Sequence, residues 1–141
     1  MINLKKLLTK ILNKLYYANN FGVITGAILP DKSISSGSSW VNYGSFTVPE
    51  GAWILFIAVQ FSTNNTGYRQ FTLGDSSGAA GVLNRTVRIA ATPGAATSLT
   101  MACAVTGGTY YINVCQNSGS ALTVYGRYTA IKVGESFSSY E

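Results

Sequence analysis

Histidine is absent from the 141 residues, and charged side chains make up only 11% of them, against a usual share of about 25%. Without histidine the chain lacks the commonest general base and the commonest metal ligand. The five acidic residues show no spacing typical of a catalytic pair, and they are Asp31, Glu50, Asp75, Glu135 and Glu141. A glycosidase would need two of them to face each other across a cleft, and Glu50 with Asp75 is the pair to examine. We therefore expect no enzymatic activity, no cofactor and no metal site.

Basic residues are few and unevenly placed. Four lysines lie within the first fourteen residues, with no acidic residue among them, and they are Lys5, Lys6, Lys10 and Lys14. They account for most of the net charge of +5, because the rest of the chain carries six basic and five acidic residues. No basic stripe follows the body of the protein, which argues against nucleic-acid binding.

Long apolar runs are also missing. No run approaches the length that spans a membrane, and Lys10 and Lys14 interrupt the apolar residues at the N-terminus, where a secretory signal would need an unbroken stretch. We expect no signal peptide. A composition so poor in charge suits a durable extracellular or virion surface, or large subunit interfaces.

Cysteine occurs only at positions 103 and 115. The segment from Leu99 to Gln116 contains Thr106-Gly107-Gly108-Thr109 at its centre, which predicts a hairpin with a Gly-Gly turn. In that register Cys103 lies opposite Ile112 and Cys115 opposite Thr100, so the sulfurs lie on opposite faces and cannot bridge. Buried free thiols are the expected outcome.

The stretch from Ser45 to Phe61, SFTVPEGAWILFIAVQF, is the most apolar part of the chain. Pro49-Glu50-Gly51 is expected to divide it into a short strand and a long one. Side chains alternate across a strand, yet both faces of the long one are apolar: Trp53, Leu55, Ile57, Val59 and Phe61 on one, Ile54, Phe56 and Ala58 on the other. An antiparallel sheet of a monomer normally keeps one polar face. One face should therefore meet a second sheet and the other something else, such as another copy of the chain.

Residues Leu4–Tyr16 carry the helical pattern. Its apolar residues follow a four-three-four spacing, widened by Leu7 and Leu12, and they are Leu4, Leu8, Ile11 and Leu15. A helix of about thirteen residues is marginal alone in water, so it needs a partner. The spacing favours a parallel bundle of copies; another protein, a membrane surface or its own domain are the alternatives.

The rest of the chain reads as short strands between turn clusters. A first strand is expected over Gly22–Leu29, with a loop or an irregular edge over Ser33–Ser39, and later strands over Tyr68–Leu73, Arg85–Ala90 and Leu122–Val133. Gly126 inside the last strand predicts a bulge or a close backbone approach. This pattern predicts an antiparallel jelly-roll β-sandwich. Its parts are an amphipathic helix (1–17), a connector and first strand (18–32), the jelly-roll head (33–134) and a polar tail (135–141).

Four segments occur in a familiar order: FTVPEGAWILFIAVQF (46–61), GYRQFTL (67–73), TYYINVCQNSGSALTV (109–124) and YGRYTAIKV (125–133). Together they resemble the trimeric jelly-roll heads of the tumour-necrosis-factor and complement-head type, versions of which occur in bacteriophage tail and fibre proteins. The resemblance covers roughly Ser33 to Val133. It implies a homotrimer around an axis, and we expect Phe56, Tyr125 and Tyr128 to lie between the subunits with the helix residues.

The resemblance further implies a virion structural or attachment protein, joined to other virion proteins through its helix and able to bind a host-surface receptor such as a glycan. Receptor sites of such heads lie on variable loops, so no binding residue carries over. The candidate loop residues here are Asn64, Asn65, Tyr68, Asp75 and Ser76. A decoration protein of a capsid or appendage, without receptor binding, and a stand-alone carbohydrate-binding module are the alternatives. Three arginines are expected to face solvent or to form hydrogen bonds across a subunit interface rather than to bind a ligand, and they are Arg69, Arg85 and Arg88. Trp40, Tyr43 and Tyr68 suit edge packing better than sugar stacking.

Overall fold

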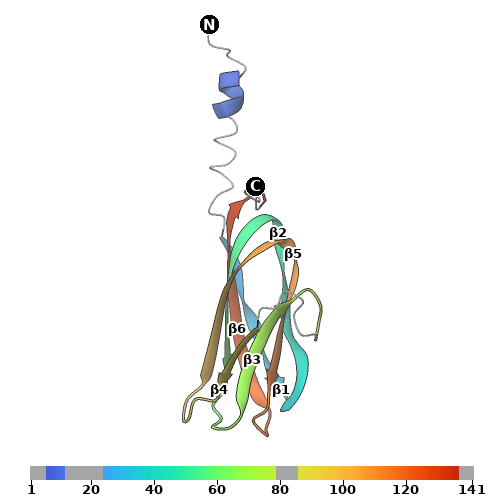
Figure 1. Cartoon of the computed structure of the whole chain (residues 1–141), viewed down its shortest axis with the longest axis vertical. Helices are drawn as coiled ribbons and strands as arrows, with labels where there is room; N and C mark the ends of the chain where they lie inside the picture. Colours follow the sequence, from blue (N-terminus) through green and yellow to red (C-terminus); the bar gives the residue numbers. More distant parts are fainter. Residues whose placement is uncertain (1–5, 12–23, 79–85, 137–141) are drawn as a thin grey trace.

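The computed structural model describes residues 6–11, 24–78 and 86–136. Residues 6–11 are helical. The six strands are β1 (Ile24–Ile34), β2 (Gly37–Phe61), β3 (Tyr68–Gly74), β4 (Thr86–Ala90), β5 (Thr97–Gln116) and β6 (Leu122–Gly134). They pair antiparallel in the order β1-β6-β2-β5-β3-β4 (Figure 1). The predicted mainly β, antiparallel architecture with one short helix is confirmed.

Strands β2 and β5 hold the body together because they pair over nearly their whole length, from Gly37 with Gln116 to Phe61 with Thr97. The second part of β2, from Ala52 onward, also pairs with β6, which pairs with β1. The second part of β5, from Tyr111 onward, pairs with β3, which pairs with β4. The ladder therefore has a β1–β6 half and a β3–β4 half, joined by a long β2–β5 ribbon (Figure 1).

Contacts between strands that do not pair there show that the two halves face each other. The ring of Phe46, in the first part of β2, stacks on the ring of Tyr128 in β6 with centroids 4.0 Å apart. The Tyr43 ring packs where a Cβ of Gly126 would lie, so this glycine makes room for a side chain and not for the predicted bulge or backbone approach. The hydroxyl of Tyr43 points to the Leu29 carbonyl. Burial raises the pKa of this phenol to about 12, with a smaller contribution from the charge of Asp31. Tyr43 is a core residue.

The ribbon bends where the two long strands cross from one half to the other. In β2 the register with β5 shifts between Val48 and Ala52, around Pro49-Glu50-Gly51. The indole N–H of Trp53 donates to the Pro49 carbonyl at 2.9 Å and holds this bend. The predicted break after Pro49 is thus a bend within one continuous strand.

Strand β5 passes the same corner, and the predicted hairpin at Gly107-Gly108 is wrong. Residues 97–116 form one strand, in which Cys103 pairs with Leu55 and Cys115 with Gln70. A Cβ on Gly107 would lie 2.7 Å from the Pro49 carbonyl oxygen and 2.6 Å from the Glu50 Cα. The glycine is needed for the close approach of the β2 backbone at the bend, and not for a turn. Both thiols are free; Cys115 is buried as expected, whereas Cys103 is partly exposed. The two residues lie on opposite sides of the bend, Cys103 in the part of β5 that pairs with Leu55 and Cys115 in the part that pairs with Gln70.

The first strand is longer than the sequence predicts. β1 continues through Pro30-Asp31 to Ile34, with a bulge between Leu29 and Lys32 that lets the proline sit in an edge strand. Strand β2 begins at Gly37, so the loop expected over Ser33–Ser39 shortens to Ser35 and Ser36. The strands predicted over Tyr68–Leu73 and Leu122–Val133 are present within one residue of their bounds.

The body has two distinct ends. β1 begins and β6 ends beside the bend, because Ile24 pairs with Ile131 and Ala52 with Gly134. The connections after β1, β2, β4 and β5 lie at the other end (Figure 1). The chain therefore enters and leaves at the bend end and presents four loops at the far end.

Candidate functional site

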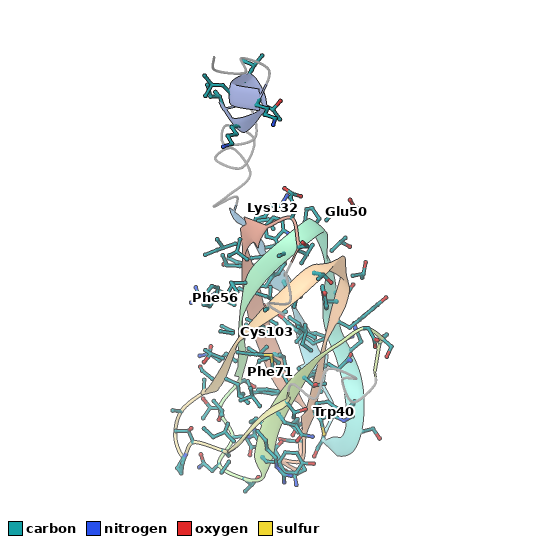
Figure 2. The ribbon with its side chains drawn as sticks, turned by 45° about the horizontal axis from the view of Figure 1, so that its top comes forward. Trp40, Glu50, Phe56, Phe71, Cys103 and Lys132 are labelled. Carbon is teal, nitrogen blue, oxygen red and sulfur yellow. The ribbon has the colours of Figure 1, made fainter. Side chains whose placement is uncertain are left out.

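The outer surface of the β1–β6 half is unusually apolar for an exposed sheet. Trp53, Leu55, Ile57, Val59 and Phe61 are buried between the halves, as predicted. The alternate residues of β2 point outward, and Phe56 is 46% exposed. Figure 2 shows Phe56 at the outside of the body, in contrast to Phe71 within it. Neighbouring strands extend this surface, which we call the apolar face: Ile28, Phe56, Ala58, Tyr125, Arg127 and Thr129.

The register explains why these side chains gather. Phe56 pairs with Thr129, Ala58 with Arg127, and Ile28 with the same arginine from the other side. Partners in an antiparallel ladder point to the same face. Ile28 is 84% exposed and Tyr125 39% exposed. The second apolar side of the central strand, predicted from sequence, is thus left uncovered in a single chain.

Three open depressions lie on the apolar face, and Arg127 lines all three. The first has a volume of about 300 Å³ and is also lined by Ile28, Asp31, Gln60 and Tyr125. Among the described residues, neither Arg127 nor Asp31 forms an ion pair; the salt bridge found there joins Lys132 to Glu135. The apolar face therefore carries one unpaired cation at its centre and one unpaired anion at its β1 edge.

The helix over residues 6–11 exposes its apolar side chains too. Leu8 is 56% exposed and Ile11 46% exposed, as is Leu7 at 43%. Leu4 and Leu15 lie outside the described residues. Within the described part of the chain, the predicted stripe has no covering partner.

Tyr128 was predicted to lie with Phe56 and Tyr125 between subunits, but its ring points the other way. It packs on Phe46 between the two halves, because an odd number of positions along the strand separates it from Tyr125 and from Arg127, which point outward. Phe56 and Tyr125 share the apolar face.

The four connections at the far end of the body, which we call the loop end, are joined to one another by hydrogen bonds and form one tied cluster. The Asn64 amide donates to the Ser120 hydroxyl at 3.1 Å, and the Asn65 amide oxygen accepts from the Gly94 N–H at 2.8 Å. The Ser36 hydroxyl accepts from the Gly119 N–H at 2.9 Å. These bonds join the β1–β2, β2–β3, β4–β5 and β5–β6 connections. Two of the five predicted loop residues, Asn64 and Asn65, therefore fix the shape of this surface.

The other three predicted loop residues lie over the outer surface of the β3–β4 half. Asn113 holds the loop after β3 with two hydrogen bonds of 2.9 Å, to the Ser76 carbonyl and from the Gly78 N–H. Asp75 is exposed beside it. The ring of Tyr68 is covered by the Arg88 guanidinium at 3.8 Å, and its hydroxyl lies 3.8 Å from the Cys115 sulfur. Tyr68 is occupied by these contacts, so the structure does not join the five residues into one site.

Arg69, which the sequence places toward solvent or an interface, is fully buried, and that prediction is wrong. Its Nη1 donates to the carbonyls of Thr66 and Tyr68 at 2.9 and 3.0 Å, and its Nη2 to the Asn64 carbonyl at 3.2 Å. Burial lowers the pKa of the guanidinium. Gln116, also fully buried, binds the carbonyls of Ile34 and Ser120. Together the two side chains close the core at the loop end.

A grouping that could hold a metal ion is not seen in the part of the chain that the structure describes. No three acidic or cysteine side chains come together there. Glu50 is exposed at the bend (Figure 2) and Asp75 in the loop after β3, and neither lines the three depressions. The helix over residues 6–11 is too short to cross a membrane, and residues 24–78 and 86–136 contain no other helix.

No protein-family model and no curated protein matches the sequence. The fold is similar to part of infectious bursal disease virus, Gx strain, with a TM-score of 0.53 and 11% identity over 77% of this chain and 31% of that one. It is also similar to a protein of Bacillus endospore appendages, described as disulfide-linked pili, with a TM-score of 0.50 and 11% identity over 80% and 91% of the two chains. Likeness at such identities shows the fold, and it confirms the predicted jelly roll.

Proposed function

We propose that the chain is a non-enzymatic structural or attachment component of a bacteriophage virion and acts as a homotrimer. The apolar face carries the part of this proposal that concerns assembly. A monomer would leave Ile28, Phe56 and Tyr125 against water, although each large apolar side chain gains about 1.5–3 kcal/mol on full burial. Contiguous exposed apolar surface of this kind typically marks an interface. Burial against two further copies would cover it.

The difference between the two ends of the body supports the same assembly. The strand that follows the helix starts at the bend end, and the tied loops lie at the far end. A trimer that packs its apolar faces around an axis parallel to the strands would gather three N-terminal segments at one end. The exposed Leu8 and Ile11 would then meet their counterparts or another virion protein. Three loop ends would point outward, where a receptor could bind.

Replacing Phe56 with aspartate should convert the trimer to monomers, because it removes a large apolar side chain from the contact and buries a carboxylate in its place. Light scattering of the intact protein at micromolar concentration would then fall from three times 15.0 kDa to one. Ile89→Asp is the matched control, since Ile89 is equally exposed, at 45%, but lies in β4 of the other half. A wild-type mass near 15.0 kDa, or equal loss of mass in both variants, would contradict the proposed interface.

An attachment protein would bind its receptor through the loop end, whereas a decoration protein would not. If the loops bind a glycan, the wild-type protein should bind a glycan array, and adding bulk with Thr63→Arg and Ala95→Arg should abolish binding. Both positions are exposed in the tied cluster, and neither side chain holds another loop. Ser77→Arg, in the loop over the β3–β4 half, should leave binding intact. A negative array together with tight binding to purified virion shells would instead indicate a decoration protein.

A further inference from the structure

Arg127 is the cation at the centre of the apolar face, and its surroundings leave its charge unmatched. It lines all three depressions, beside Ala58 and Ile28. Among the described residues no hydrogen bond or ion pair holds its guanidinium. In a monomer this matters little, because water solvates the exposed charge. In an assembly that covers the face, the same charge would lose its water.

A covered arginine needs an anion, since removing an ion from water costs several kcal/mol unless a well-placed partner compensates. The chain has five acidic residues to supply one. Glu135 is paired with Lys132, Glu50 lies at the bend, and Asp75 lies over the β3–β4 half. Glu141 is outside the described residues. Asp31 is the one that borders the apolar face, and it lines the same depression as Arg127.

Asp31 lies in the bulge of β1, the edge strand of the β1–β6 half. In a closed ring of three copies each contact is heterologous, so different patches of neighbouring subunits meet. The edge of one subunit can then lie against the face of the next. This arrangement brings the edge residue Asp31 toward a neighbour's Arg127 and repeats three times around the ring. It also covers the exposed edge strand.

We propose that Arg127 of each subunit pairs with Asp31 of the next, so that the ion pair is completed only in the trimer and selects the ring over other packings. The inference rests on the proposed function, because it requires the apolar face to be the trimer contact. It adds the residues that set the register of that contact. Charge pairs across an interface fix orientation and exclude wrong partners more than they add affinity.

Charge reversal tests the pairing. Arg127→Asp and Asp31→Arg should each raise the concentration at which the trimer dissociates, on the order of a hundredfold, because like charges then meet across every contact. The double variant, Asp31→Arg with Arg127→Asp, restores opposite charges and should recover most of the wild-type midpoint. Sedimentation velocity over a dilution series measures all four proteins. Arg88→Asp, an exposed reversal on the other half, should leave the midpoint unchanged, and circular dichroism confirms that each variant is folded.

The outcomes separate this inference from the proposed function. A wild-type trimer whose midpoint is unmoved by either single reversal would overturn the Arg127–Asp31 pair while leaving the trimer intact. Loss of the trimer in both singles without recovery in the double would place the two charges in the interface but not against each other, and would also overturn the pair. A monomeric wild-type protein would remove the proposed assembly itself. The pairing is supported only if the single reversals raise the midpoint of trimer dissociation and the double variant restores it.

Discussion

Replacing Arg69 with alanine is expected to lower the free energy of unfolding by about 3–5 kcal/mol, the scale of a large cavity combined with lost buried hydrogen bonds. The side chain is fully buried and donates to three backbone carbonyls, those of Asn64, Thr66 and Tyr68. Alanine would leave these carbonyls facing a void, and the β2–β3 connection would lose the side chain that anchors it.

Urea unfolding followed by tryptophan fluorescence measures the change, since Trp53 is buried in the core. Arg69→Lys is the informative companion, because an ammonium cannot present the guanidinium's planar set of donors to three carbonyls. We expect the free energy of unfolding of Arg69→Lys to lie between those of Arg69→Ala and the wild type. If Arg69→Ala unfolds within about 1 kcal/mol of the wild type, an ordinary value for a surface substitution, the guanidinium does not hold the loop end.

Replacing Gly107 with alanine should destabilise the protein by about 3 kcal/mol, the upper range for forcing one extra carbon into a packed site. The added Cβ would meet backbone atoms of β2 at the corner, with the Pro49 carbonyl oxygen at 2.7 Å and the Glu50 nitrogen at 2.9 Å. This backbone cannot move aside as a side chain can, because the ladder pairs that flank it, Val48 with Gly108 and Ala52 with Thr106, hold both of its ends. The two long strands would have to separate where the halves join.

Thermal unfolding of Gly107→Ala beside Gly37→Ala isolates this effect. A Cβ on Gly37 would have no atom within 4 Å, and its backbone does not require glycine. Gly37→Ala should therefore be neutral or slightly stabilising through the unfolded chain. Equal melting temperatures for the two variants would show that the strands do not cross tightly at Gly107.

The sequence predicted the parts of this fold that depend on local pattern. Alternation over Trp53–Phe61 indicated the central strand and both its faces, and the structure buries one face and exposes Phe56 on the other. Turn chemistry placed the connection before Tyr68. The hairpin at Gly107-Gly108 was wrong because two glycines suit a tight turn and a backbone crossing equally, and only the distant Pro49-Glu50 decides between them.

For the candidate surfaces too, some features were predictable from the sequence and others depend on the tertiary structure. The composition indicated a surface poor in charge, because only 11% of the residues are charged. The shortness of the helical pattern indicated that the helix needs a partner. Tertiary structure decided which residues share a surface. Alternation along the strand already puts Tyr125 and Tyr128 on opposite faces. Pairing of β6 with β2 decided which of the two faces is covered: Tyr125 and Arg127 point outward and the Tyr128 ring packs on Phe46. The tertiary structure also buried Arg69. Its three carbonyl partners come together around the guanidinium only when the β2–β3 connection is folded. Local pattern is set by neighbours along the chain, whereas burial and pairing are set by residues far apart in it.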